Sequence, residues 1–149
     1  MCIRDRLKSE PSAKRPKGEV ATGREIWRAG PDGKSVIEEY SQKSSDGEFK
    51  LFSIGWWDEK DQGQRFLNCD SSQEHGCELS KEVARWEGNS LVYTEEREEN
   101  GAKVVRQEIF TDIQPMSFTQ ILKSGPSSKE LRTEITIHAT KLTQRAANK

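Results

Sequence analysis

The chain has 149 residues, of which 32% are hydrophobic and 33% are charged, with 24 basic and 25 acidic side chains. This length supports one hydrophobic core, so we expect one domain with a thin core rather than two globular units. The formal net charge of -1 gives no reason to expect nucleic acid as a partner. We expect no membrane span, because no apolar run approaches the roughly 18 residues that a spanning helix requires.

Residues 1–18 differ in composition from the rest of the chain. They are rich in lysine, arginine, serine and proline without apolar periodicity, so we expect an artefactual or disordered segment. Residues 1–6, Met-Cys-Ile-Arg-Asp-Arg, resemble the in-frame translation of the transposase mosaic end that tags DNA for sequencing. We therefore expect a reading frame that starts in an adapter joined to an environmental gene fragment, with the native start and any export signal missing. A genuine basic amino-terminal arm is the alternative.

Turn signals recur at short intervals from Val20 onward. Gly30-Pro31-Asp32-Gly33 and Asp46-Gly47 are typical of tight turns. Further signals are Gly88-Asn89, Asn100-Gly101, Pro115 and Ser124-Gly125-Pro126. These boundaries predict no helix and nine strands, at residues 20–29, 36–41, 49–57, 65–69, 77–86, 91–97, 103–113, 118–123 and 131–142.

The spacing of the predicted strands favours hairpins. A βαβ crossover needs about a dozen residues or more, and the predicted connections are shorter. Closing an antiparallel meander into a barrel also removes the exposed sheet edges that invite aggregation. We therefore predict an all-β fold, a single antiparallel meander β-barrel over residues 19–143, with a tail at 144–149.

Alternation along the strands predicts which side chains point inward. In the last strand the inward set is Leu131, Thr133, Ile135, Ile137 and Ala139, and the outward set includes His138. The same rule predicts an inward set of Val105, Gln107, Ile109, Phe118, Gln120 and Leu122. Residues 49–57 are apolar on both faces, which predicts a strand that is covered on both sides or lies against a neighbouring chain.

Five segments carry a family resemblance: Gly23-Arg24-Glu25-Ile26-Trp27, Gly30-Pro31-Asp32-Gly33 before Ser35-Val36-Ile37-Glu38-Glu39, Trp56-Trp57-Asp58, Trp86-Glu87-Gly88-Asn89 and Phe110-Thr111-Asp112-Ile113. Over residues 18–142 they resemble an uncharacterised bacterial family of lipocalin-like domains of unknown function. The resemblance implies a calycin-type barrel, often in exported or envelope proteins, and it supplies no catalytic residues. We therefore expect an exported or periplasmic protein, and the paired cysteines favour the same location.

Cys69 and Cys77 flank the predicted loop at residues 70–76, where two strands would meet. A disulfide across this hairpin mouth is one prediction, and two ordinary thiols are another. A third reading is a zinc site made by Cys69, His75 and Cys77 with Asp70, although the spacing matches no standard structural site. We assign no metal and no cofactor.

Acid–base catalysis would have to use Arg106, Glu108 and His138, or else His75. Alternation places the first three on faces assigned to solvent. The sequence contains no nucleophile elbow, no glycine-rich phosphate loop and no His-Glu-x-x-His motif. An enzyme is therefore the third hypothesis.

Polar residues on predicted inward faces indicate a ligand. Asn68, Gln107 and Gln120 lie among apolar neighbours, and a buried amide requires a hydrogen-bond partner, a water or a ligand. Trp27, Trp57 and Tyr93 could form the walls of such a cavity. The leading hypothesis is a non-catalytic barrel that binds a small, partly apolar ligand through these six residues.

Two alternatives stay open. Neighbouring side chains or water could satisfy the three amides without any ligand. The domain could instead be a structural or interaction module whose partner covers residues 49–57. The sequence fixes neither the ligand nor the oligomeric state.

Overall fold

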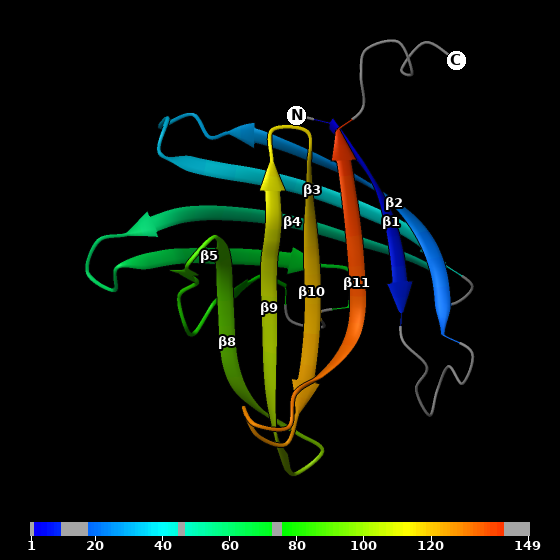
Figure 1. Ribbon diagram of the computed structural model, residues 1–149. Coiled ribbons are helices and arrows are strands. Elements are labelled where there is room, and N and C mark those ends of the chain that lie inside the picture. The colour runs from blue at the N-terminus through cyan, green and yellow to red at the C-terminus, as the bar shows by residue number, and fades with distance from the viewer. Residues whose placement is uncertain (1, 10–17, 45–46, 73–75, 142–149) are drawn as a thin grey trace.

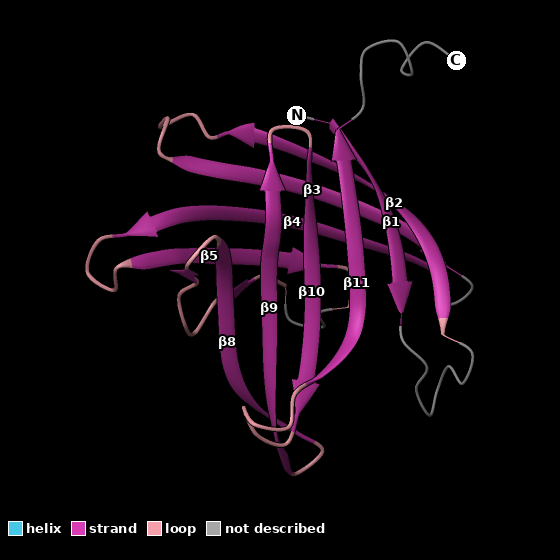
Figure 2. Cartoon of the chain, in the orientation of Figure 1, coloured by secondary structure: helices cyan, strands magenta, loops and turns pink. Residues whose placement is uncertain are grey.

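The computed structural model describes residues 2–9, 18–44, 47–72 and 76–141. Every regular element in these ranges is a β-strand (Figure 2), which confirms the all-β prediction. None of the described residues belongs to a helix with the length and hydropathy to cross a membrane. The strands are β1 Cys2–Ser9, β2 Glu19–Ala29, β3 Ser35–Ser44, β4 Gly47–Asp58, β5 Gly63–Asp70, β6 Glu78–Leu79, β7 Arg85–Glu87, β8 Ser90–Glu99, β9 Ala102–Gln114, β10 Ser117–Gly125 and β11 Arg132–Lys141.

The strands form an antiparallel meander in the order β6-β5-β4-β3-β2-β1-β11-β10-β9-β8-β7. We call β2–β6 the first sheet and β7–β11 the second sheet. β1 pairs with β2 on one side and with β11 on the other, and so joins the two sheets. Figure 1 shows β2–β5 crossing behind the upright strands β8–β11.

The closed nine-stranded barrel that we predicted is wrong, although the antiparallel meander is confirmed. The strand order is linear, with five strands on each side of β1. Its two end strands, β6 and β7, have only two and three residues. Strands this short provide no ladder that could close a barrel. In the described part of the chain, one isolated bridge, between Gln64 of β5 and Ala84 just before β7, joins the two ends of the order.

Two differences account for eleven strands in place of nine. β1 was not among the predicted strands, and it lies within the segment that we assigned as artefactual or disordered. The predicted strand at 77–86 is split into β6 and β7. The split follows from Ser80, whose backbone N–H donates to the carbonyl of Phe66 while its Oγ accepts from the Phe66 N–H. Beyond Ser80 the chain leaves β5 and crosses to the second sheet.

The predicted turns have the expected local chemistry. Asp32 Oδ1 accepts hydrogen bonds from the Lys34 and Ser35 backbone N–H groups and from Ser35 Oγ, at 3.1, 2.9 and 2.6 Å. The hydrogen bonds from Ser35, the side-chain one first, lower the pKa of Asp32 to about 2. At the β8–β9 turn, Asn100 and Gly101 have φ angles of 53° and 76°, the left-handed geometry that a two-residue hairpin requires. Asp46 lies outside the described residues.

The apolar core is small, as the composition predicted. We call the inner face of each sheet the side that carries Ala21 in β2 and Ile137 in β11, which pack together with Leu122 and Ile135. The prediction that Ile135, Ile137 and Ala139 share the inward face is confirmed. The buried apolar residues of the described chain are Ala21, Val83, Ala84, Leu91, Val92, Val105, Ile137 and Ala139.

A bulge in β11 ends the predicted alternation. Leu122 of β10 pairs with Ile135, but the next residue, Lys123, pairs with Thr133, so Glu134 has no direct partner on β10. Thr133 is therefore on the face opposite to Ile135, contrary to the prediction.

The contact between β5 and the chain before β7 is tightly packed. Gln64 and Ala84 exchange two backbone hydrogen bonds of 2.8 Å. A Cβ atom placed on the preceding Gly63 would lie 2.5 Å from Val83 Cγ2 and 2.8 Å from the Ala84 carbonyl oxygen. Only glycine therefore fits here without displacing the segment that reaches the second sheet.

We expect Gly63→Ala to lower the free energy of unfolding by about 1–3 kcal/mol, because the added methyl group overpacks the contact with Val83. Urea denaturation followed by tryptophan fluorescence measures the change. The control is the same substitution in a Val83→Ala background, where the cost should fall by at least about 0.5 kcal/mol. An equal cost in both backgrounds would exclude Val83 Cγ2 as the cause and leave Val83 Cβ, at 2.7 Å, and the Ala84 carbonyl oxygen, which the control does not remove.

Candidate functional site

Five of the six predicted ligand residues lie on the inner faces. In the first sheet, the cross-strand neighbours Trp27, Glu38, Ser53 and Asn68 form one row, with Ser53 buried. Trp57 follows Ser53 by four residues on the same face and is 47% exposed. In the second sheet, Gln120 pairs with Ile137, and Tyr93 shares a row with Leu122 and Ile135.

In β9 the prediction of which side chains point inward was wrong. Glu108 pairs with Leu122 and therefore lies on the inner face, whereas Gln107 lies on the opposite face. Val105 also lies on that opposite face and is nevertheless buried. Its cross-strand partner on β10 is Gly125, where an added Cβ atom would lie 2.3 Å from the Glu130 carbonyl oxygen.

The three predicted amides all have partners within the protein. Ser53 Oγ donates to Asn68 Oδ1 at 2.7 Å, and Gln107 Nε2 donates to Thr94 Oγ1 at 3.2 Å. Gln120 Nε2 donates to Glu108 Oε1. Neighbouring side chains therefore provide hydrogen-bond partners for the three amides, as the alternative hypothesis stated. The amides do not by themselves require a ligand.

Carboxylates on the inner face are the feature that the sequence analysis missed. Glu25 and Glu95 are only 3% and 6% exposed. Glu95 accepts a hydrogen bond of 2.9 Å from the Tyr93 hydroxyl and forms an ion pair with Arg97. The pairing register of the strands is the signal that could have located these two glutamates. Without that register, glutamates in charged strand segments are expected to face solvent.

Burial shifts the pKa of Glu108 and of Tyr93, which are cross-strand neighbours on the inner face. Burial raises the pKa of the Glu108 carboxyl, the hydrogen bond from Gln120 lowers it, and the negative charge of Glu95 raises it further. Burial, together with the charge of Glu95, also raises the pKa of the Tyr93 hydroxyl. Glu108 is therefore a carboxyl group whose charged form the fold disfavours.

The candidate catalytic residues do not form a joint site. Arg106 Nη2 pairs with Glu99 at 2.6 Å. Glu108 lies on the inner face, whereas His138 lies on the opposite face with its Nδ1 3.4 Å from Thr119 Oγ1. His75 lies outside the described residues.

Cys69 and Cys77 form a disulfide, with their Cα atoms 4.1 Å apart, which confirms the first of the three readings of this pair. Both sulfur atoms are used in the bond, so neither is the thiolate that a zinc ligand must be. Among the described residues no three His, Cys, Asp or Glu side chains gather as metal ligands would.

A groove of about 530 Å³ lies over β2–β5. It opens on the outer face of the first sheet, the side opposite to Glu25 and Ser53. Its lining includes the outer-face residues Arg24, Ile26, Ser41, Lys50, Phe52 and Cys69. The groove combines apolar and cationic side chains, and the disulfide forms part of its wall.

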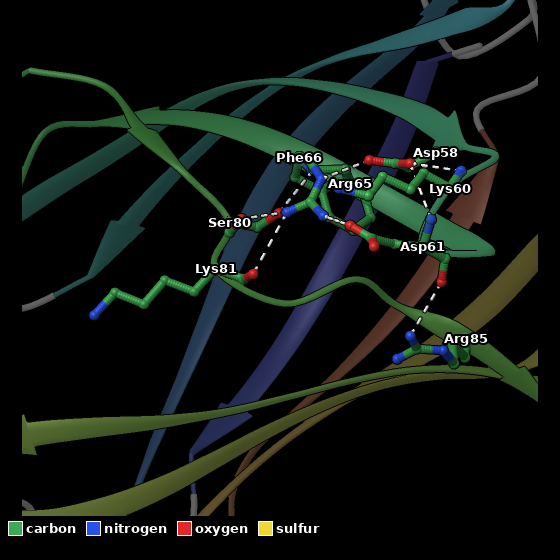
Figure 3. Close-up of polar contacts among 8 residues, drawn as sticks. All are labelled: Asp58, Lys60, Asp61, Arg65, Phe66, Ser80, Lys81 and Arg85. Carbon is green, nitrogen blue, oxygen red and sulfur yellow. Dashed lines mark hydrogen bonds and ion pairs between the residues drawn. The ribbon is translucent and has the colours of Figure 1, made fainter.

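A polar cluster beside the β4–β5 turn surrounds Arg65 (Figure 3). Its guanidinium donates to Asp58 Oδ2 at 3.0 Å, to Asp61, and to the backbone carbonyl oxygens of Ser80 and Lys81 at 3.0 and 3.4 Å. The Arg65 side chain is only 15% exposed. The cluster therefore connects the β4–β5 turn to the segment that leaves β6.

Asp58 and Arg85 complete this cluster. Asp58 Oδ1 accepts from the Lys60 and Asp61 backbone N–H groups at 3.0 and 3.1 Å, and Arg85 Nη2 donates to the Asp61 carbonyl oxygen at 3.0 Å. The Asp61 N–H first and Arg65 next lower the pKa of Asp58. Since the Arg65 guanidinium and the Asp58 carboxylate both have their partners within the protein, we assign the cluster a structural role.

Comparison with known proteins assigns no family. No protein-family model matches the chain, and no curated protein matches it either.

We expect Arg65→Lys to lower the urea midpoint of unfolding, because one ammonium group cannot contact two carboxylates and two carbonyl oxygens in this fixed arrangement. The matched control is Arg28→Lys, which affects one exposed ion pair of 2.7 Å with Glu39. Equal midpoints for the two variants would contradict the role of the cluster.

Glu108→Gln should stabilise the protein at pH 7 and have little effect at pH 4. The folded-state pKa of Glu108 lies above its unfolded value, so wild-type stability falls as pH rises through the interval between the two. Glutamine removes this loss and keeps an oxygen that accepts from Gln120. Urea denaturation at both pH values measures the effect, with exposed Glu98→Gln as the control. A less stable Glu108→Gln protein at pH 7 would refute the assignment.

Proposed function

We propose that this protein is a non-catalytic binding module for a small, partly apolar ligand, and that the ligand binds in the outer groove over β2–β5. The observation that carries the proposal is the groove of about 530 Å³, a size within the roughly 300–1,000 Å³ of small-molecule sites. The inner faces are less suitable, because their polar groups already pair with one another.

The groove supplies an apolar floor. Ile26 and Phe52 lie in one row across β2, β3 and β4, with Glu39, which pairs with Arg28, between them, and Phe52 is 36% exposed. A ligand that covers Phe52 and Ile26 removes apolar surface from water, at about 25 cal/mol per Å². Polar groups at the edge of the groove would then orient the ligand rather than supply most of the affinity.

The proposal includes the lipocalin-like relationship and an exported or periplasmic location. The Cys69–Cys77 disulfide supports this location, because disulfides persist in oxidising compartments. The groove differs in place from the interior site that a lipocalin-like barrel would offer.

An interaction module is the second candidate. Ile37, Ile54, Leu67 and Leu79 are cross-strand neighbours in the next outer row, and Leu79 is 55% exposed. A protein partner that covered this row would also cover the outer-face residues Phe52 and Ile54 of β4. If this candidate is correct, the molecular mass of the protein in solution increases with its concentration or when a partner is added.

We expect Phe52→Ala to weaken binding of the neutral fluorophore N-phenyl-1-naphthylamine by about five- to thirtyfold, equivalent to about 1–2 kcal/mol of lost apolar contact. Fluorescence titration measures the affinity, and circular dichroism verifies the fold. Met116→Ala is the matched control, because Met116 is 44% exposed and lies outside the groove. Equal affinities of wild type and Phe52→Ala, or equal losses in both variants, would reject the groove as the site.

A further inference from the structure

The groove has a cationic row directly beside its apolar row. Arg24 pairs with Ser41, and Ser41 pairs with Lys50, so the three residues form a line across β2, β3 and β4. Ser71 extends this line, because its N–H donates to the Lys50 carbonyl at 2.9 Å and its Oγ accepts from the Lys50 N–H at 3.0 Å. Two cations and two hydroxyl groups thus follow one edge of the floor formed by Ile26 and Phe52.

The carboxylates near this edge only partly balance its cations. Glu39 lies in the apolar row but is paired with Arg28 at 2.7 Å. Lys50 Nζ lies 3.1 Å from Glu48, and this pair and the Arg28–Glu39 pair are both exposed and therefore weak. Lys43, the cross-strand neighbour of Glu48, adds a further positive charge on the same face. The edge therefore has a net positive field.

We propose that the groove selects ligands that carry an anionic group, namely a carboxylate, sulfonate or phosphate, on a small apolar body. This inference rests on the proposed function and adds the chemical class of the ligand. The Cα atoms of Arg24 and Lys50 are separated by two strand spacings, about 10 Å, which two long side chains can span around one oxyanion. Ser41 lies between them as a hydroxyl donor to the same group.

The geometry also fixes the direction of the ligand. The anion lies over the row of Arg24, Ser41 and Lys50, and the apolar body extends over Ile26 and Phe52 toward the row of Ile37 and Ile54. A strongly polar body would lose the apolar contacts. A cationic body would in addition face the like charges of Arg24 and Lys50. An aromatic or short acyl anion therefore fits the groove.

A matched pair of probes tests this inference: 8-anilino-1-naphthalenesulfonate and N-phenyl-1-naphthylamine, which differ by one sulfonate group. We expect Arg24→Gln and Lys50→Gln each to weaken the sulfonate probe about five- to tenfold, while the neutral probe changes less than about twofold. Raising the salt concentration from about 20 to 300 mM should weaken only the sulfonate probe, because exposed charges are screened. Lys129→Gln, an exposed lysine outside the groove, is the control.

The outcomes separate this inference from the proposed function. If the neutral probe depends on Phe52 but the sulfonate probe is insensitive to both charge variants and to salt, the anion selectivity is wrong and the groove remains the site. If the charge variants weaken both probes equally, the two cations act on the structure of the groove and the inference is also wrong. If neither probe responds to Phe52→Ala, the proposed function itself fails.

Discussion

The Arg65 guanidinium holds the place where the chain passes from the first sheet to the second. It binds Asp58 and Asp61 of the β4–β5 turn and the carbonyl oxygens of Ser80 and Lys81 in the departing segment. Directly beyond this point, Gln64 and Ala84 form the bridge between the two ends of the strand order. Because the end strands are too short to form a ladder, this cluster and β1 at the opposite side determine how the two sheets face each other.

Facing sheets impose a chemical condition on their inner sides. The chain has few large apolar residues, so polar side chains also lie where water is excluded, and each then needs a partner. The fold meets the condition by pairing them locally, as Ser53 with Asn68, Gln120 with Glu108, and Glu95 with Tyr93 and Arg97. Inner-face groups that already pair in this way gain little from a ligand, whereas the outer face of the first sheet carries the groove.

The parts of the fold that depend on local chemistry could be predicted from the sequence. Asp32 and Asn100-Gly101 determine their turns through nearby hydrogen bonds and left-handed backbone angles, and the Cys69–Cys77 pairing was one of three open readings. The phase of β9 could not be predicted, because Val105 and Ile109 on one face and Val104 and Phe110 on the other are equally apolar. Pairing with β10 decides the phase, and that pairing is long-range.

The groove was beyond prediction for the same reason, since its lining comes from four strands whose register must be known together. The apolar floor and the cationic edge of the groove are nevertheless linked to one another. Cys69 is the cross-strand neighbour of Phe52, and the disulfide to Cys77 closes the loop that carries Ser71, whose hydrogen bonds hold the Lys50 backbone. The apolar floor and the cationic edge are thus connected through one covalently closed loop. A binding surface on an open sheet face gains affinity when its parts are held in place before the ligand arrives.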